Sequence, residues 1–155
     1  MEHFHEPPGK TVTCRRATSE HDLSEAFAIR LKVFVDEQGV PDHLERDSDD
    51  SGALHMMAYV DGVAAGTARL VATMKGQGKI GRVAVLKEYR GIGLGKLIME
   101  ALHREAALQG IETIALDAQV MVIPFYRALG YREQGREFID CGILHRTMTL
   151  AIENK

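Results

Sequence analysis

Residues 82–96 read RVAVLKEYRGIGLGK and join an apolar strand to a helix through a glycine-rich loop. The run Val83–Val85 is typical of a central strand that is covered on both faces. Glycines between a strand and a helix let backbone N–H groups approach an anion, and the helix N-terminus adds about half a positive charge. Arg90 and Lys96 flank the loop with full charges. We therefore predict a pyrophosphate-binding loop at residues 90–96.

Two common phosphate-binding motifs do not fit this loop. Gly91, Gly93 and Gly95 are spaced two and two, so the dinucleotide fingerprint G-x-G-x-x-G fails. A P-loop fails as well, because Arg90 stands where its first glycine should be and Lys96 is not followed by serine or threonine. A glycine-rich turn without a ligand, or a site for another nucleotide phosphate, stays open at this point.

Hydrophobic periodicity and turn residues predict the other elements. Apolar residues at helical spacing predict a helix that begins after Ser19 and ends near Gly39, and Asp61-Gly62 is a strong hairpin signal. The expected strands lie at residues 11–15, 54–60, 63–73, 80–86, 113–118, 132–138 and 145–152, and the expected helices at 20–38, 93–109 and 124–129. This order predicts an α/β (α+β) fold with a mixed central sheet flanked by helices on both faces.

Length and composition indicate a single globular domain. The chain has 155 residues, of which 45% are hydrophobic and 26% charged. We expect a flexible lead-in at residues 1–10, which does not resemble a signal peptide, and one domain over residues 11–155. Cys14 and Cys141 are too few for a disulfide framework, which favours the cytoplasm.

Two classes of partner are not expected. The net charge of −3 lacks the broad basic footprint of a nucleic-acid binder. The longest apolar run, Met56–Val60, has five residues, whereas a membrane-spanning helix needs about 20.

The acidic stretch at residues 42–52 is predicted to be a solvated loop. Asp47–Gly52 partly resembles a calcium loop, but Ala58 stands where the bidentate glutamate should be. We assign the pair His3 and His5 to the lead-in, so no metal site is expected. The carboxylates of this stretch could instead face a cationic substrate or act as a base.

Two motifs carry a resemblance to a known family. Arg90, Gly93 and Gly95 match the pattern [Gln/Arg]-x-x-Gly-x-[Gly/Ala], and Phe125–Tyr131 resembles the signature Phe-Tyr-x-x-x-Gly-Phe/Tyr. The chain resembles the GNAT superfamily of acetyl-CoA-dependent N-acetyltransferases over residues 11–152. Segments such as Arg30–Pro41 resemble a bacterial subgroup of mostly predicted acetyltransferases.

The resemblance implies a single-domain GNAT fold with a splayed strand before the glycine loop, and acetyl-CoA as co-substrate. The implied cofactor-binding residues are Val83, Ala84, Val85, Arg90, Gly91, Ile92, Gly93, Leu94, Gly95, Lys96, Gln119 and Tyr126. A backbone N–H at Val83 or Val85 would stabilise the oxyanion, and Tyr126 would act as general acid at the leaving sulfur.

The general base is less well defined, because Arg82 stands where many members of the superfamily carry a glutamate. Glu45 is the assigned candidate. A base relayed through water, or none, is also open, and the other candidate side chains are Glu37, Asp47, His55 and His145.

The implied activity is transfer of an acetyl group to a primary amine of a small molecule or peptide, by direct attack in a ternary complex. A non-catalytic CoA-binding module is the alternative, and a homodimer is expected from the family. If Arg69 or Arg82 faces the cleft, the acceptor carries a carboxylate; if residues 42–50 face it, the acceptor is a polyamine or a lysine side chain.

Overall fold

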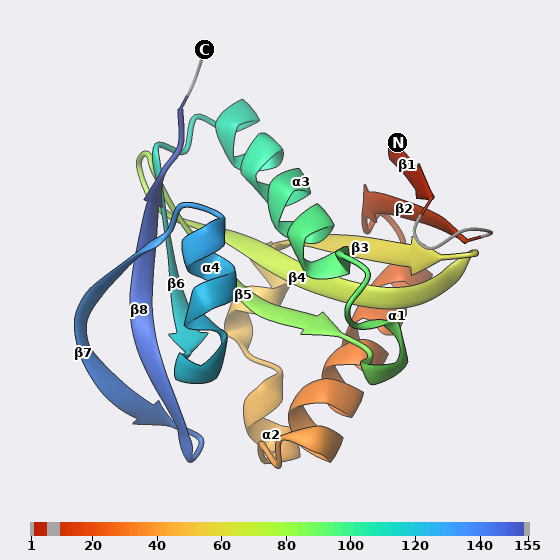
Figure 1. Ribbon diagram of the computed structural model, residues 1–155, viewed down its shortest axis with the longest axis horizontal. Helices are drawn as coiled ribbons and strands as arrows, with labels where there is room; N and C mark the ends of the chain where they lie inside the picture. The colour runs from red at the N-terminus through yellow and green to blue at the C-terminus, as the bar shows by residue number, and fades with distance from the viewer. Residues whose placement is uncertain (1, 6–9, 154–155) are drawn as a thin grey trace.

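The computed structural model describes residues 2–5 and 10–153, and its strands form one mixed sheet between helices (Figure 1). Along the sheet the strand order is β1-β2-β3-β4-β5-β6-β8-β7. The strands are β1 (Glu2–His5), β2 (Thr11–Arg16), β3 (Leu54–Val60), β4 (Val63–Met74), β5 (Gln77–Val85), β6 (Thr113–Gln119), β7 (Arg132–Asp140) and β8 (Ile143–Ala151). Only β5 and β6 pair in parallel; the other neighbours are antiparallel.

The helices cover both faces of the sheet, as predicted. They are α1 (Glu20–Arg30), which continues as a π-helix (Leu31–Glu37), α2 (Asp42–Glu45), α3 (Leu94–Leu108) and α4 (Ile123–Ala128), with short 3₁₀ turns at Ser48–Gly52, Lys87–Tyr89 and Val120–Val122. β3 shows the two faces: Met56 and Ala58 pack in the core that contains α3, whereas Met57 and Tyr59 pack in the core that contains α1.

The sequence predictions hold for most elements and fail in three places. Residues 2–5 form β1 against β2, where an irregular lead-in was expected; the rest of that prediction, at residues 6–9, lies outside the described residues. The second half of the first helix is π-helical. The stretch at 42–52, expected to be a solvated loop, is mostly exposed but contains α2 and a 3₁₀ turn capped by Asp47. In the third place, the arginines that bond the segment are Arg30, Arg69 and Arg82, which lie far from it in the chain, so local periodicity carries no signal for these contacts.

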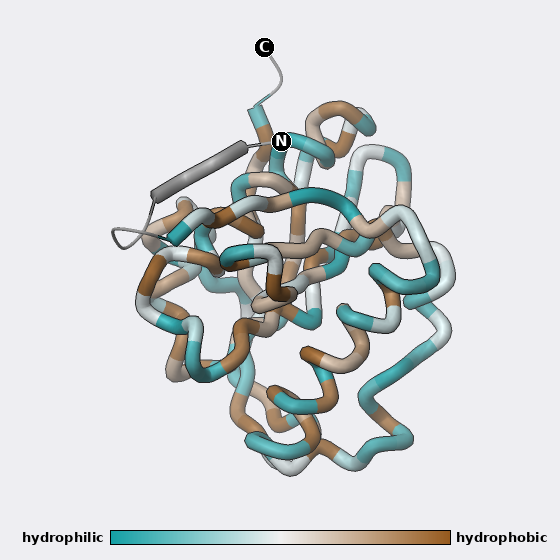
Figure 2. Tube along the Cα trace, turned by 90° about the vertical axis from the view of Figure 1, so that its right-hand side faces the viewer, coloured by the Kyte–Doolittle hydropathy of each residue, from teal (hydrophilic) through white to brown (hydrophobic). Residues whose placement is uncertain are grey.

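Apolar residues are interleaved with polar ones along the coloured part of the trace (Figure 2). No helix in the described part of the chain is both long and apolar enough to cross a membrane.

The decisive feature of the sheet is that β5 and β6 separate. Only Gln77–Lys79 pair with β6, at Thr113–Ala115, and beyond Lys79 the two arrows point apart (Figure 1). This confirms the predicted splayed strand. From Ile80 onward, β5 has a strand neighbour only on its β4 side.

β5 also carries a β-bulge inside the splayed half. In the register with β4, Thr67 pairs with Ala84 and Arg69 with Gly81, so Arg82 and Val83 together oppose a single residue. Arg82 has a φ of +53°, in the left-handed region that residues other than glycine rarely adopt. Beyond the bulge, Ala84 and Val85 pair with β4 again.

Candidate functional site

The splayed half of β5 directs backbone polar groups into the gap beside β6. Leu86 N–H donates to Ala65 O at 2.9 Å, so residue 86 points its polar groups towards β4. Successive residues of a strand point their N–H and C=O groups to opposite sides. The N–H and C=O of Val85 therefore point towards the gap. The Val85 carbonyl accepts a bond of 2.9 Å from Arg90 Nε. By the same alternation, the backbone N–H and C=O of Val83 point towards the gap as well.

The glycine loop places an uncapped helix N-terminus next to this gap. Gly91 and Gly93 have φ values of +87° and +89°, which favour glycine, and no atom lies within 4 Å of where a Cβ would stand on either. Gly93 is the N-cap of α3 and supplies no side-chain acceptor for the N–H groups of the first turn. The loop therefore offers several backbone donors and the positive end of a 15-residue helix.

Gly95 has a different reason to be glycine. A Cβ at this position would lie 3.2 Å from Phe125 Cζ, so the missing side chain lets α4 pack closely against the start of α3. This contact brings the helix that carries Tyr126 to the glycine loop.

The two cations that flank the loop are placed differently. Arg90 forms a forked ion pair with Glu37 at the end of the π-helix, at 3.0 and 2.7 Å. Lys96 is exposed, and no ion pair is recorded for it within the described residues. Of the two charges, Lys96 alone is therefore available to an anion without breaking an existing ion pair.

Tyr126 is buried in α4 with 7% of its surface exposed. Its ring makes edge contacts with Phe125 and Tyr131, at centroid distances of 5.0 and 5.9 Å. Burial raises the pKa of Tyr126 to about 12, so the phenol keeps its proton near neutral pH. Among the described residues no fully buried side-chain oxygen lacks a hydrogen-bond partner. The Tyr126 hydroxyl has no hydrogen bond to another described residue, so it cannot be fully buried and must be accessible to solvent or to a ligand.

Gln119 closes the other side of the gap. It lies at the end of β6, and its Nε2 donates to Oε1 of Gln38 at 2.8 Å. Gln38 directly follows Glu37, the partner of Arg90. The end of the π-helix therefore contacts both chain segments that border the gap, and sequence reasoning missed this role of Gln38.

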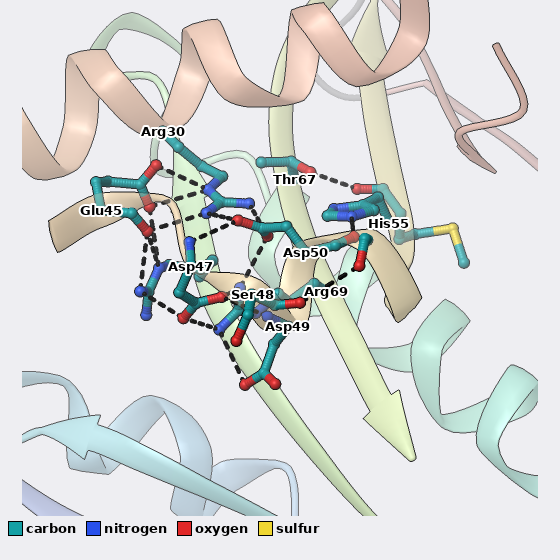
Figure 3. A network of polar contacts seen from close by, with 12 residues as sticks. Arg30, Glu45, Asp47, Ser48, Asp49, Asp50, His55, Thr67 and Arg69 are labelled. Carbon is teal, nitrogen blue, oxygen red and sulfur yellow. Dashed lines mark hydrogen bonds and ion pairs between the residues drawn. The ribbon is translucent and has the colours of Figure 1, made fainter. Parts of the chain in front are cut away.

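Most of the acidic segment at residues 42–52 is exposed, as predicted, but Glu45 is buried and the carboxylates of the segment form half of an ion-pair network (Figure 3). Arg30 in α1 donates to both carboxylate oxygens of Glu45, at 3.0 and 3.1 Å, and to both of Asp50, at 2.7 and 3.1 Å. Arg69 in β4 bonds Asp47 at 2.6 Å and Asp50 at 2.8 Å. Arg30 and Glu45 are 1% and 2% exposed.

These arginines shift the titration of the acids that they contact. The bond to Arg69 is the main cause that lowers the pKa of Asp47. The pKa of Asp50 is also lowered, because its bonds to Arg30 and Arg69 outweigh the burial that would raise it. Both acids therefore stay charged through the neutral and mildly acidic range.

The network joins the two sets of charges on which the acceptor hypotheses rest. Arg82 bonds Glu45 Oε2 at 2.9 Å and Asp47 at 3.2 Å, so the strand arginines are paired with the acidic segment itself. One acceptor hypothesis places Arg69 or Arg82 in the cleft, and the other places the acidic residues 42–50 there. Since the halves neutralise each other, neither hypothesis gains support.

The two candidate histidines lie apart from the glycine loop in the chain and have backbone partners. His55 is buried in β3, with Nε2 3.0 Å from Asp50 O. His145 lies in β8, with Nδ1 2.7 Å from Ile143 O. Within residues 10–153, no three side chains of the types that bind metals are grouped closely enough to hold an ion.

A pair that the sequence analysis did not single out lies beneath Tyr126. His103 Nε2 in α3 is 2.7 Å from the hydroxyl of Tyr131, whose ring contacts Tyr126. Burial lowers the pKa of His103 to about 4, so this histidine is neutral in the folded protein near pH 7.

A domain family described as acetyltransferase (GNAT) domain matches residues 15–152. The provisionally named acetyltransferase BSU40680 of Bacillus subtilis (strain 168) is 44% identical over 141 residues, which cover 89% of this chain and 95% of the relative.

Solved structures show the same fold. An acyl-CoA N-acyltransferase from Pseudomonas aeruginosa is 30% identical, with a TM-score of 0.77 over 91% of this chain and 99% of that one. The CoA-dependent acyl-homoserine lactone synthase BjaI, solved with SAM and isopentyl-CoA, is 18% identical and shares the fold, with a TM-score of 0.72 over 94% of this chain and 84% of that one.

His103 predicts a pH dependence of stability. Its folded pKa of about 4 lies below the value near 6.5 of an unfolded histidine, so between these two values the unfolded state binds the extra proton. We expect the free energy of unfolding to fall as the pH falls from about 6.5 to about 4. Urea unfolding at several pH values should show a shallower fall for His103→Gln, which removes the titration but keeps a hydrogen-bonding group.

The control for this experiment is His21→Gln, because the His21 side chain is 81% exposed. Asp47 and Asp50 have lowered pKa values, so they contribute mainly below the tested window. Equal slopes for His103→Gln and the wild type would contradict the assignment.

Proposed function

Because the chain belongs to the GNAT acetyltransferase family, we propose that it transfers an acetyl group from acetyl-CoA to a primary amine of a small molecule or peptide. The observation that carries the proposal is the gap between β5 and β6, into which β5 points the N–H groups of Val83 and Val85 beside an uncapped helix N-terminus. Its action in the cytoplasm and its assembly as a homodimer stay predictions from the sequence.

The residues of the loop suit a pyrophosphate. The N–H groups at the start of α3 and the left-handed glycines Gly91 and Gly93 supply donors, and Lys96 supplies a full positive charge. The extended backbone of β5 beyond Lys79 suits an amide-containing arm, because an unpaired strand edge can bond an extended ligand as it would a strand. BjaI, which shares the fold, was solved with isopentyl-CoA.

In the proposed reaction, the amine nitrogen bonds to the thioester carbon, the carbon–sulfur bond breaks, and the amine loses a proton. An N–H of Val83 or Val85 donates to the carbonyl oxygen as negative charge develops there, a contact typically worth about 3–4 kcal/mol. Tyr126 donates a hydrogen bond or its proton to the departing sulfur. Its buried phenol is protonated near pH 7, as this role requires.

No side chain is assigned as the base in this proposal. Glu45 and Asp47 are bonded to arginines, and Glu37 is bonded to Arg90. Each would have to leave an ion pair in order to accept a proton. The amine therefore reaches the site neutral or loses its proton through water.

A non-catalytic module that binds acetyl-CoA is the second candidate. It is favoured by one observation: Arg82 occupies the position on the splayed strand where many members of the family carry a glutamate, and it is engaged by Glu45. The two candidates share a cofactor site and differ only in turnover.

The glycine loop is tested by Gly93→Val. A β-branched residue at a φ of +89° is strained, and the distorted loop should weaken CoA binding at least about tenfold in isothermal titration calorimetry. Gly110→Val is the matched control, because Gly110 has a φ of +76° with open space around it at the opposite end of α3. Both variants should lose stability, and CoA affinity that is equal in the two would overturn the assignment.

The ion pair of Arg90 predicts that CoA binds more tightly to Glu37→Gln. Removing the carboxylate frees the guanidinium for the phosphates, and an exposed ion pair of this kind is worth up to about 1 kcal/mol, or about fivefold in affinity. Glu88→Gln is the control, since Glu88 is an exposed carboxylate close to the loop with no ion pair recorded in the described residues. If both variants change the affinity for CoA equally, the cause is the loss of one negative charge near the loop and not the release of Arg90.

Tyr126→Phe separates the enzyme from the binding module. We expect the release of free thiol from acetyl-CoA, measured with a panel of amines, to fall on the order of 10²-fold, because a positioned general acid contributes this much. CoA affinity should stay within about twofold, since the ring is kept. Thermal stabilisation of the wild type by acetyl-CoA with no turnover on any amine would favour the module.

A further inference from the structure

Arg82 holds an unfavourable backbone conformation at the most important point of the splayed strand. Its φ of +53° lies in the left-handed region, and the bulge at Arg82 and Val83 includes the first of the two residues whose N–H groups point into the gap. A residue other than glycine persists there only when its surroundings hold it in place.

The hydrogen bonds of the Arg82 side chain can hold the backbone in this conformation. Its Nε lies 2.9 Å from Glu45 Oε2 and 3.1 Å from Glu45 O, and its Nη2 lies 2.9 Å from Glu45 O and 3.2 Å from Asp47 Oδ2. Four contacts therefore fasten one guanidinium to the end of α2 and the residues that follow it.

Glu45 is in turn fixed from the other side. Arg30 in α1 donates Nε to both of its carboxylate oxygens and Nη2 to its carbonyl oxygen at 3.2 Å, and both residues are at most 2% exposed. Arg30 also bonds Asp50, which bonds Arg69 in β4. The two strands that form the bulge are thus both tied to the same acidic segment and, through Arg30, to α1.

We propose that Glu45 and Arg82 are positioning residues that hold the bulge of β5 so that the N–H groups of Val83 and Val85 face the thioester oxygen. This inference rests on the proposed acetyl transfer. It gives Glu45 a role through Arg82 in place of proton transfer from the amine. The same pair accounts for an arginine at a position where glycine would fit the backbone without strain.

Arg82→Gly is the central variant. Glycine adopts a φ of +53° without strain, so the backbone conformation is permitted while the anchor is lost. Glu45 keeps its bonds to Arg30, so no buried carboxylate is left without a cation and the variant should fold. We expect kcat to fall on the order of 10²-fold, as for a misplaced catalytic group, with KM for acetyl-CoA within about twofold.

Two further variants frame this result. Arg82→Lys keeps the charge but not the fork and should give a kcat between those of the wild type and Arg82→Gly. Arg15→Gly is the matched control, because Arg15 also projects from a strand to a buried carboxylate, Asp22 at 2.8 Å, at a place remote from the bulge in the sheet. It should lower stability and leave kcat unchanged.

The affinities for acetyl-CoA and CoA distinguish a positioning role of Arg82 from a role in the overall stability of the fold. The contact with the thioester oxygen exists with acetyl-CoA and not with CoA. Arg82→Gly should therefore weaken the binding of acetyl-CoA slightly, by no more than the twofold allowed for KM, and leave the affinity for CoA unchanged. If Arg82→Gly keeps the kcat of the wild type, or loses stability and both affinities in parallel, the proposal is wrong.

A pH profile separates positioning from base catalysis by Glu45. If Glu45 positions the bulge, Glu45→Gln and Arg82→Gly both lower kcat/KM and leave the shape of its pH profile unchanged. If Glu45 is the base, Glu45→Gln removes the acidic limb of the profile and Arg82→Gly does not. Because Glu45→Gln leaves Arg30 short of a counterion and can fail to fold, the decision then rests on Arg82→Gly.

Hydrogen–deuterium exchange keeps the test independent of activity. If the wild type neither binds acetyl-CoA nor releases thiol with any amine, the proposed function is wrong while the anchoring of the bulge can still be measured. Amides at residues 82–86 should exchange faster in Arg82→Gly than in the wild type and in Arg15→Gly. Unchanged exchange at these amides would overturn the anchoring.

Discussion

The site depends on one constraint: β5 and β6 pair over three residues and then separate. A strand that loses its neighbour inside a sheet exposes N–H and C=O groups, and such groups need partners when water is excluded. In this protein, Arg90 Nε donates a hydrogen bond to the carbonyl of Val85, and the N–H groups on the same side stay available to a ligand. The separation therefore creates both an opening in the sheet and a row of donors along its edge.

The ion-pair network connects this edge of the sheet with α1 and the acidic segment at residues 42–52. Three arginines, Arg30, Arg69 and Arg82, meet carboxylates from one short segment, and the pairs connect α1, α2, β4 and β5. Burying such pairs is not by itself a source of stability, because desolvation offsets the attraction between the charges. Their effect on geometry is clearer, since each pair joins elements that lie far apart in the chain.

Local patterns predicted most of the fold correctly. The expected strand at 54–60 coincides with β3, and the expected helix at 93–109 agrees with α3 to within a residue at each end. Such elements have strong periodicity or clear end signals, which act over a few residues. The glycine loop was also visible, because left-handed backbone at Gly91 and Gly93 is a property that glycine itself supplies.

The partners of the charged side chains could not be predicted in this way. Arg90 was assigned to phosphate from its place beside the loop, yet it bonds Glu37, 53 residues away, and Glu45 was considered as a base, yet it is enclosed by Arg30 and Arg82. A residue's own conformational preference is encoded near it in the chain, and the elements and the loop follow from that preference. The ion partner of a long side chain depends on which distant segments the packed sheet brings within reach, so only the folded molecule defines it.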